Sequence, residues 1–208
     1  MPRLMDMGLE KLNSLMMEMA TLSEDAVSVA IEAYVTGKKS REVNVWAEKL
    51  RSLHRQVSEL SIELIARYQP VASDLRYIKS CFEISYGFFR YGRYAHDIIE
   101  VLEMFGDLSK CDHTMVNETA RKTQEMIRMS IDAFTRKDVG LAKKIPAMDD
   151  VVDDRYRKNL SEMMKGAADT KCALSTALVL RYLERIADHA TYISESVVYI
   201  VTGLEPPA

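Results

Sequence analysis

The sequence has little glycine and proline, with 8 glycines and 5 prolines in 208 residues. Loop-rich β-sandwiches use more of both, so this scarcity argues against that class and favours long helices. No segment shows the alternation of apolar and polar residues that is typical of a half-buried strand. The composition and the patterning therefore predict an all-α protein.

Cysteine is also scarce. Cys81, Cys111 and Cys172 are scattered, with no CxxC pair and none of the cysteine–histidine spacings that form zinc sites. An odd and sparse cysteine count fits a protein of a reducing compartment.

Neither a basic excess nor a long apolar run is present. The net charge is −3, which argues against a nucleic-acid partner because such proteins usually carry a basic face. The first residues lack a signal-peptide pattern, and no apolar run approaches the roughly 18 to 20 residues of a membrane span. We therefore expect a soluble, cytoplasmic protein that reaches a membrane only through a partner.

Six long helices are predicted from apolar residues that recur with a period near 3.6. They cover about residues 4–36, 41–68, 73–105, 113–136, 139–165 and 169–202. Gly37, Pro70, Gly106 and Gly203 are expected to end helices, and Pro146 can interrupt the fifth. Ser73 is expected to cap the third helix.

The two halves of the chain repeat one another. FFRYGRYA at residues 88–95 aligns with LERIADHA at residues 183–190, and residues 30–34 align with residues 130–134. A repeat this long indicates a duplicated module. We therefore predict two three-helix bundles packed side by side, one formed by residues 1–106 and the other by residues 107–208.

Acidic pairs mark the second half. Glu184 and Asp188 are four residues apart and share one helix face, as do Asp149 and Asp153. If the connector near Gly166 is tight, the two helices run antiparallel and the pairs meet at the same height. Four carboxylates at one level suit Mg²⁺, Mn²⁺ or iron.

A plainer interpretation of these acids is ion pairing with nearby arginines, namely Arg155, Arg157, Arg181 and Arg185. His189 follows Asp188 but lies about 100° around the helix. It is therefore a candidate for supporting a metal ligand, for the core or for the surface. Spacing alone does not decide between metal binding and ion pairing.

Signatures of catalysis are missing. The sequence has no glycine-rich phosphate loop, no GxSxG, and no Glu-x-x-His on the helix of Glu184. We therefore predict that the protein is not an enzyme. A carboxylate-bridged metal enzyme and a helical interaction protein without metal stay open as alternatives.

Three motifs resemble one family. RYQPVASDLR at residues 67–76 resembles the RxQPxAxDLR signature of the PhoU family of phosphate transport regulators. LERIADHA at residues 183–190 is similar to the family's LERIGDHA, and DDVVD at residues 149–153 is similar to its DDxVD. The motifs occur in the family's order and spacing along nearly the whole chain.

The resemblance implies two three-helix repeats and a cytoplasmic, usually dimeric regulator that is not an enzyme. PhoU proteins act at the phosphate ABC transporter and, in bacteria, on the sensor kinase of the phosphate response. They keep this response off when phosphate is plentiful. Family members bind metal clusters, iron among them, through E(D)xxxD motifs on each repeat.

The first repeat departs from this motif, because Phe89 and Arg93 stand where the family has acidic residues. We therefore predict iron or another divalent cation at one site or at none. The ligands of that one site would be Glu184, Asp188, Asp149 and Asp153. Arg93 would replace the ion with a fixed charge and pair with a carboxylate, either Asp97 or Glu48.

The turn between the second and third helices carries Arg67, Asp74 and Arg76 of the family signature. These residues either hold the turn through salt bridges or mark a contact site for a partner. The resemblance implies transporter subunits and a sensor kinase as partners, in addition to a second copy of the chain.

Overall fold

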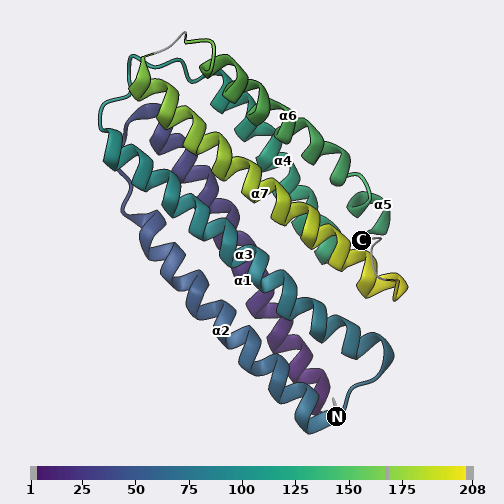
Figure 1. The fold of residues 1–208 in the computed structure, drawn as a ribbon. Helices are drawn as coiled ribbons and strands as arrows, with labels where there is room; N and C mark the ends of the chain where they lie inside the picture. Colours follow the sequence, from purple (N-terminus) through teal and green to yellow (C-terminus); the bar gives the residue numbers. More distant parts are fainter. Residues whose placement is uncertain (1–3, 167–168, 205–208) are drawn as a thin grey trace.

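The computed structural model describes residues 4–166 and 169–204. This part of the chain is all-α, without strands, and has seven helices (Figure 1). They are α1 (Leu4–Thr36), α2 (Glu42–Tyr68), α3 (Ala72–Phe105), α4 (Thr114–Arg136), α5 (Val139–Ala142), α6 (Pro146–Met163) and α7 (Thr170–Thr202). The predicted all-α class is confirmed, and the predicted fifth helix is divided at Pro146 into α5 and α6.

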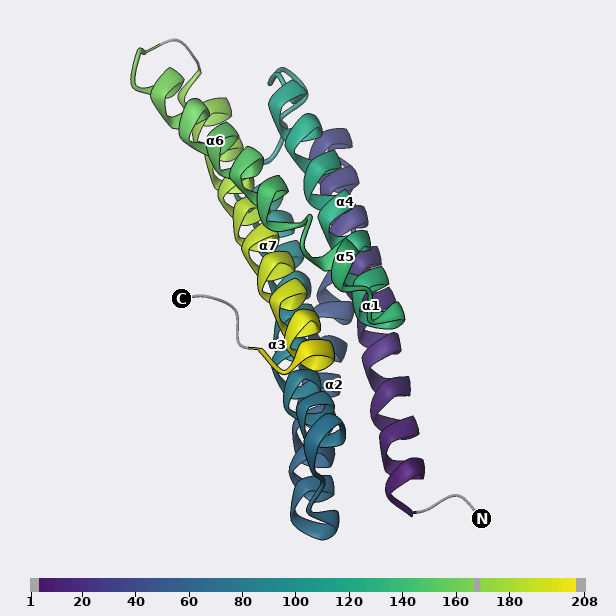
Figure 2. The ribbon, with the colours of Figure 1, turned by 90° about the vertical axis from the view of Figure 1, so that its right-hand side faces the viewer.

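The helices form two antiparallel groups of three long rods that lie side by side, as Figures 1 and 2 show. One group is α1, α2 and α3, and the other is α4, α6 and α7. The most extensive contact between the groups is that of α3 with α7, and α1 also packs against α4. This architecture places α6 on the outer side of α7, where the two helices run antiparallel.

The helix ends follow the local chemistry in most cases. α2 ends at Tyr68, because Gln69 takes a left-handed conformation with φ 47° just before Pro70. Gly203 ends α7 with φ 73°, a conformation that costs glycine no steric strain. The prediction that Ser73 caps α3 is wrong. The N-cap is Val71, which makes no side-chain cap, and Ser73 lies inside the first turn.

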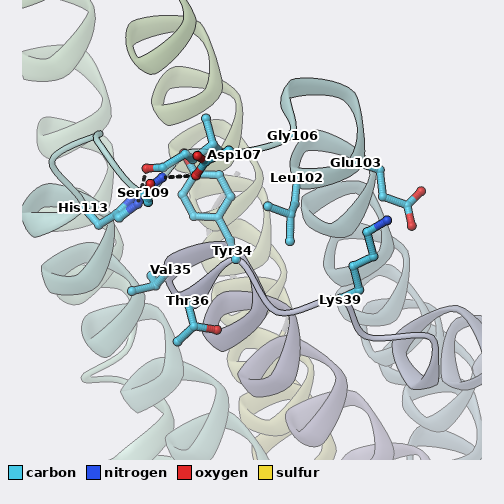
Figure 3. Close-up of a pocket in the computed structure, with 12 residues that line it drawn as sticks. Tyr34, Val35, Thr36, Lys39, Leu102, Glu103, Gly106, Asp107, Ser109 and His113 are labelled. Carbon is cyan, nitrogen blue, oxygen red and sulfur yellow. Dashed lines mark hydrogen bonds between the residues drawn. The ribbon is translucent and has the colours of Figure 1, made fainter.

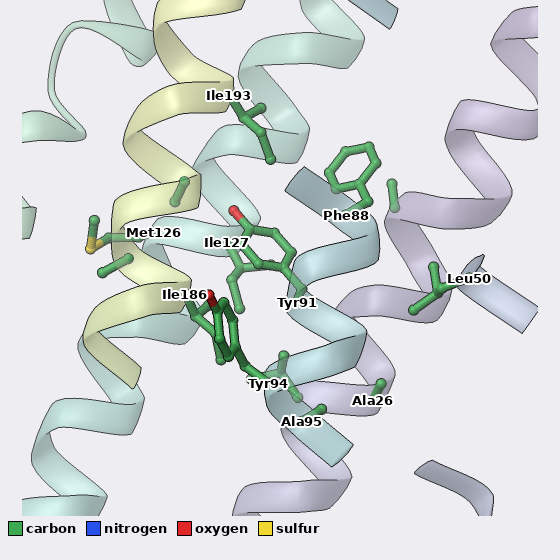
Figure 4. Close-up of a cluster of buried hydrophobic side chains, with 14 of the residues drawn as sticks. Ala26, Leu50, Phe88, Tyr91, Tyr94, Ala95, Met126, Ile127, Ile186 and Ile193 are labelled. Atoms are coloured by element: carbon green, nitrogen blue, oxygen red, sulfur yellow. The ribbon is translucent and has the colours of Figure 1, made fainter. Parts of the chain in front are cut away.

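The core runs through both groups of helices and is continuous across the contact of α3 with the second group (Figure 4). Phe88 and Tyr91 of α3 are fully buried, together with Ile186 and Ile193 of α7. Gly87 lets the two helices approach, because a Cβ atom there would lie 2.9 Å from the side chain of Ile193. The two halves of the chain therefore share one continuous core.

A disulfide joins Cys111, in the connector before α4, to Cys172 in the first turn of α7. The interpretation of the cysteines as thiols of a reducing compartment does not hold for this pair. Their Cα atoms lie 5.4 Å apart, a spacing that suits a disulfide, although 61 positions separate them in sequence. Cys81 is free and buried, and burial raises the pKa of its thiol to about 12.

Within residues 4–166 and 169–204, no helix combines the length and the apolar character that a membrane span requires.

Candidate metal centre

The antiparallel packing of α6 and α7 brings the predicted carboxylates together. Asp149 and Asp153 project from α6, and Asp188 projects from α7. Each of the three offers one oxygen, and these oxygens all lie within 4.8 Å of one another. The expectation that the two acidic pairs meet at the same height is therefore met for three of the four residues.

Glu184, the fourth predicted ligand, lies one turn before Asp188 on α7 and is 9% exposed. Its Oε1 atom accepts a hydrogen bond from Arg181 Nη1 at 2.5 Å. Its charge raises the pKa of Asp149, so it belongs to the same electrostatic group. Glu184 therefore lines the edge of the cluster.

Two oxygens of the cluster are buried without a partner. Asp153 Oδ1 and Glu184 Oε2 are shielded from solvent and make no hydrogen bond. Asp149 Oδ1 makes none of normal geometry, but the nearby Thr191 hydroxyl lowers the pKa of Asp149. Leaving a buried acceptor unsatisfied costs about 1–3 kcal/mol, and more when it is charged. A hard divalent cation bound by these oxygens would remove that cost, so this donor set fits such an ion.

Arginines occupy the outer side of the same carboxylates. Arg157 Nη2 lies 3.0 Å from Asp153 Oδ2, and Arg185 Nη1 lies 3.0 Å from Asp188 Oδ2. The side chains of the two arginines are at least 41% exposed, so each pair contributes little to stability. The predicted ion pairs therefore form for Arg157, Arg181 and Arg185 but not for Arg155, whose Nη1 atom is buried without a hydrogen-bond partner. They leave the inner oxygens of Asp153 and Glu184 unpaired.

The electrostatics of the cluster favour protons or a cation. Burial, followed by the charges of Asp188 and Asp153, raises the pKa of Asp149 to about 6. Burial is also the main reason why the pKa values of Glu184 and Asp188 are raised. Arg185 lowers the pKa of Asp188 but does not cancel the effect of burial. Repulsion among the ionised carboxylates therefore destabilises the metal-free cluster.

The metal-free protein is expected to become more stable as the pH falls through about 6. The folded state then takes up a proton at Asp149, whereas an aspartate of the unfolded chain titrates near 3.8. We expect a gain of about 1–2 kcal/mol in the free energy of unfolding, after discounting for solvent screening. Urea unfolding of the chelator-treated chain and of its Asp149→Asn variant, measured across this pH range, isolates the contribution of Asp149 to stability. Identical pH dependence in the two proteins would contradict the assignment.

His189 lies away from the carboxylates, between the rings of Tyr86 and Tyr94 at centroid distances of 5.8 Å and 6.0 Å. Burial, together with the nearby charges of Arg90 and Arg185, lowers its pKa to about 4. His189 therefore packs in the interface between α3 and α7. This position supports a role in the core rather than at the surface or beside a metal ligand.

A separate cavity of about 760 Å³ lies between the end of α1 and the connector after α3. Figure 3 shows Tyr34 and His113 within it, and their rings meet edge to face at 5.3 Å. Asp107 Oδ1 already accepts a hydrogen bond from the backbone N–H of Ser109 at 2.9 Å. This cavity shares no residue with the carboxylate cluster and adds no ligand to it.

The comparisons with known proteins identify the family. The family model described as the PhoU domain matches the chain twice, at residues 16–102 and 116–197. The chain belongs to the PhoU family. One match lies within residues 1–106 and the other within residues 107–208, in the two halves expected to be PhoU repeats.

The PhoU relatives cover nearly the whole chain. It is 32% identical over 207 residues to the phosphate-specific transport system accessory protein PhoU homolog of Pseudomonas putida, covering 95% of this chain and 80% of that protein. It is 30% identical to PhoU homolog 1 of Thermotoga maritima, with coverage of 89% and 84%.

Two solved PhoU structures share the fold. The crystal structure of PhoU from Pseudomonas aeruginosa matches with a TM-score of 0.88 and 30% identity, covering 96% of this chain and 99% of that one. PhoU from Streptococcus pneumoniae matches with a TM-score of 0.77 over 98% of this chain, and at 20% identity this match concerns the fold alone.

The first PhoU repeat differs at the corresponding positions of α3. Phe89 stacks on His54 with their ring centroids 5.8 Å apart, so an aromatic pair lies where an acid was expected from the family motif. Arg93 Nη2 lies 3.0 Å from Asp97 Oδ1, which confirms the predicted pairing for Asp97. Glu48, the alternative partner, lies 3.6 Å from Arg51 instead.

The PhoU signature residues at the α2–α3 turn do not form one network. Arg67 pairs with Glu63 on its own helix at 3.0 Å. Arg76 Nε reaches the carbonyl oxygen of Ile200 at 3.4 Å, near the end of α7. Asp74 is half-buried in the first turn of α3. Arg76 thus joins the two repeats, and a partner contact by Arg67, Asp74 and Arg76 stays a prediction.

The sequence analysis did not identify a second group of potential metal ligands, which consists of His96, Asp97 and Glu100. The four-residue spacing of His96 and Glu100 was a signal that could have found it.

Proposed function

We infer that this chain is a metal-binding accessory regulator of phosphate transport. The observation that carries the metal assignment is the cluster of Asp149, Asp153, Asp188 and Glu184, in which Asp153 Oδ1 and Glu184 Oε2 are buried without a partner. Membership of the PhoU family, and the names of its relatives as accessory proteins of the phosphate-specific transport system, support the regulatory role.

The second repeat would hold iron or another divalent cation between α6 and α7. Oxygen-only ligands suit a hard cation, and the ion would replace carboxylate repulsion with attraction. Because the ligands come from two helices, the bound ion would also fix α6 against α7. Binding at a concentration of about 100 times the Kd would add about 2.7 kcal/mol to the stability of the folded state.

The protein would act from the cytoplasm, as a homodimer, on subunits of the phosphate ABC transporter. It would also act on the sensor kinase of the phosphate response and keep that response off when phosphate is plentiful. The grouped ligands of the second repeat contain no histidine, unlike the Glu-x-x-His helices of di-iron enzymes. This difference supports a regulator rather than an enzyme.

A pull-down from the membrane fraction of the source organism tests the proposal. The metal-loaded chain is expected to recover subunits of the phosphate transporter. Chelation is expected to reduce that recovery because α6 is no longer fixed against α7, and added metal should restore it. Mass spectrometry identifies and quantifies the subunits.

Asp150→Asn combined with Asp154→Asn is the matched control, because both residues lie on α6 but are exposed. This control should behave like the unmodified chain. Transporter subunits that are never recovered would contradict the regulatory role. Recovery that is indifferent to chelation, from a chain shown to bind metal, would contradict the role of the ion.

A further inference from the structure

The first repeat has a mixed group of potential ligands on α3, separate from the carboxylates of the second repeat. His96 Nε2 lies 3.3 Å from Glu100 Oε1. His96, Asp97 and Glu100 each provide one atom, and the three atoms lie within 4.8 Å of one another. This group lies one to two turns beyond Arg93, which replaced the acid of the family motif.

Asn44 of α2 orients the imidazole. Its Oδ1 atom lies 2.7 Å from His96 Nδ1. An amide oxygen only accepts hydrogen bonds, so Nδ1 carries the proton and donates it to Asn44. The lone pair of the neutral ring is therefore on Nε2, which faces Glu100. Metal-bound histidines are commonly held by the same kind of hydrogen bond from the other ring nitrogen.

In the neutral form of the ring two acceptors face each other, because Nε2 and the Glu100 carboxylate both present lone pairs at 3.3 Å. Either a proton or a metal ion must lie between them for the contact to be favourable. Asp97, which is 8% exposed, adds a third potential metal ligand beside His96 and Glu100. Arg93 occupies Asp97 Oδ1, and the second oxygen of that carboxylate is the one available as a ligand.

Space for further ligands lies beside the imidazole. A cavity of about 100 Å³ lies in the groove between α2 and α3. Its wall is formed by His96, Asn44, Ala47 and Phe89, together with the charged side chains of Glu48, Arg51 and Arg93. A water molecule occupies about 30 Å³ of liquid volume, so the cavity has room for waters that complete a coordination sphere.

We propose that His96, Asp97 and Glu100 form a second metal site in the first repeat, of the class that takes Zn²⁺, Co²⁺ or Ni²⁺. Imidazole with carboxylates suits these ions, whereas the oxygen-only cluster between α6 and α7 suits harder ones. Asn44 is the positioning residue. The first repeat therefore exchanges one site for another of different ligand chemistry, and this assignment does not depend on the proposed function.

Titration with Zn²⁺ in the Asp149→Asn, Asp188→Asn background tests the site by itself. Isothermal calorimetry is expected to show one Zn²⁺ per chain. His96→Ala and Glu100→Gln should each weaken binding by more than about tenfold, because each removes a ligand. Asn44→Ala should weaken it by about 10–100-fold without removing a ligand. Glu103→Gln, at an exposed position on the same helix, is the control and should leave binding unchanged.

The imidazole gives a second readout that does not depend on the variants. In ¹⁵N-histidine-labelled protein, Zn²⁺ should shift the resonance of His96 Nε2 and leave Nδ1 protonated. No Zn²⁺ binding in the background protein would overturn the proposal. Binding that His96→Ala and Glu100→Gln leave unchanged would also overturn it, and would identify the His96–Glu100 contact as an ordinary ion pair.

Discussion

Asp149→Asn combined with Asp188→Asn is expected to abolish stoichiometric binding of Mn²⁺ or Fe²⁺ and to make the metal-free protein more stable. The two residues come from facing helices, so their loss removes a ligand from each side of the cluster. Both pKa values are raised by burial, and that of Asp149 is raised further by Asp188, so removing both charges relieves repulsion. We expect a gain of about 1–2 kcal/mol at neutral pH, after discounting for solvent screening.

Elemental analysis and urea unfolding measure the two effects on the same samples. Asp150→Asn with Asp154→Asn changes the net charge equally on exposed positions of α6. This control should keep the metal and change stability little. Full metal content in the double variant would contradict this prediction. So would a loss of stability in the chelator-treated double variant, which would show that the carboxylates stabilise the fold rather than bind an ion.

Phe88→Ala is expected to lower the free energy of unfolding by about 3–5 kcal/mol. The ring is fully buried, and it packs against Tyr91 at 6.2 Å and against Phe134 of α4 at 6.5 Å between centroids. Its loss leaves a cavity between the two groups of helices. Both groups should therefore lose stability together.

Phe82→Ala removes the same side chain from the same helix, at a position that is 44% exposed. Its cost should stay below about 1 kcal/mol, since surface substitutions rarely have large effects. Thermal and urea unfolding followed by circular dichroism measure both variants. Similar losses for Phe88→Ala and Phe82→Ala would contradict a core shared by the two repeats.

The helices could be predicted because their signals are local. Long 3.6-residue periods fix where α1, α3 and α7 lie, and glycine or proline ends most of them. The cap of α3 was mispredicted because the helix begins at Ala72, one residue before Ser73, so that the extended Val71 occupies the N-cap position. The Cys111–Cys172 pair could not be predicted, because the packing of the connector against α7 leaves no trace in local spacing.

The position of the candidate site along α6 and α7 could be predicted from the sequence, but the contacts of its individual oxygens could not. Counting residues from the turn near Gly166 placed Asp149 and Asp153 opposite Asp188, as the structure does. Which oxygens the arginines take depends on side-chain rotamers, which the sequence does not give. The same holds for His189, whose ring turns toward Tyr86 and Tyr94 instead of the carboxylates.

The first repeat shows how the fold tolerates loss of the motif. Arg93 and Asp97 form an ion pair there, and Phe89 stacks on His54. The carboxylates of the second repeat are therefore not required by the architecture. Their unpaired oxygens are the feature that a bound ion explains and a purely structural role does not.

Anomalous scattering from crystals grown with Mn²⁺ or Fe²⁺ tests the account most directly. A peak is expected between α6 and α7, within coordination distance of Asp149, Asp153 and Asp188, and none is expected between Phe89 and Arg93. No peak at the α6–α7 carboxylates in metal-loaded crystals, with Arg157, Arg181 and Arg185 still paired to them, would contradict this expectation.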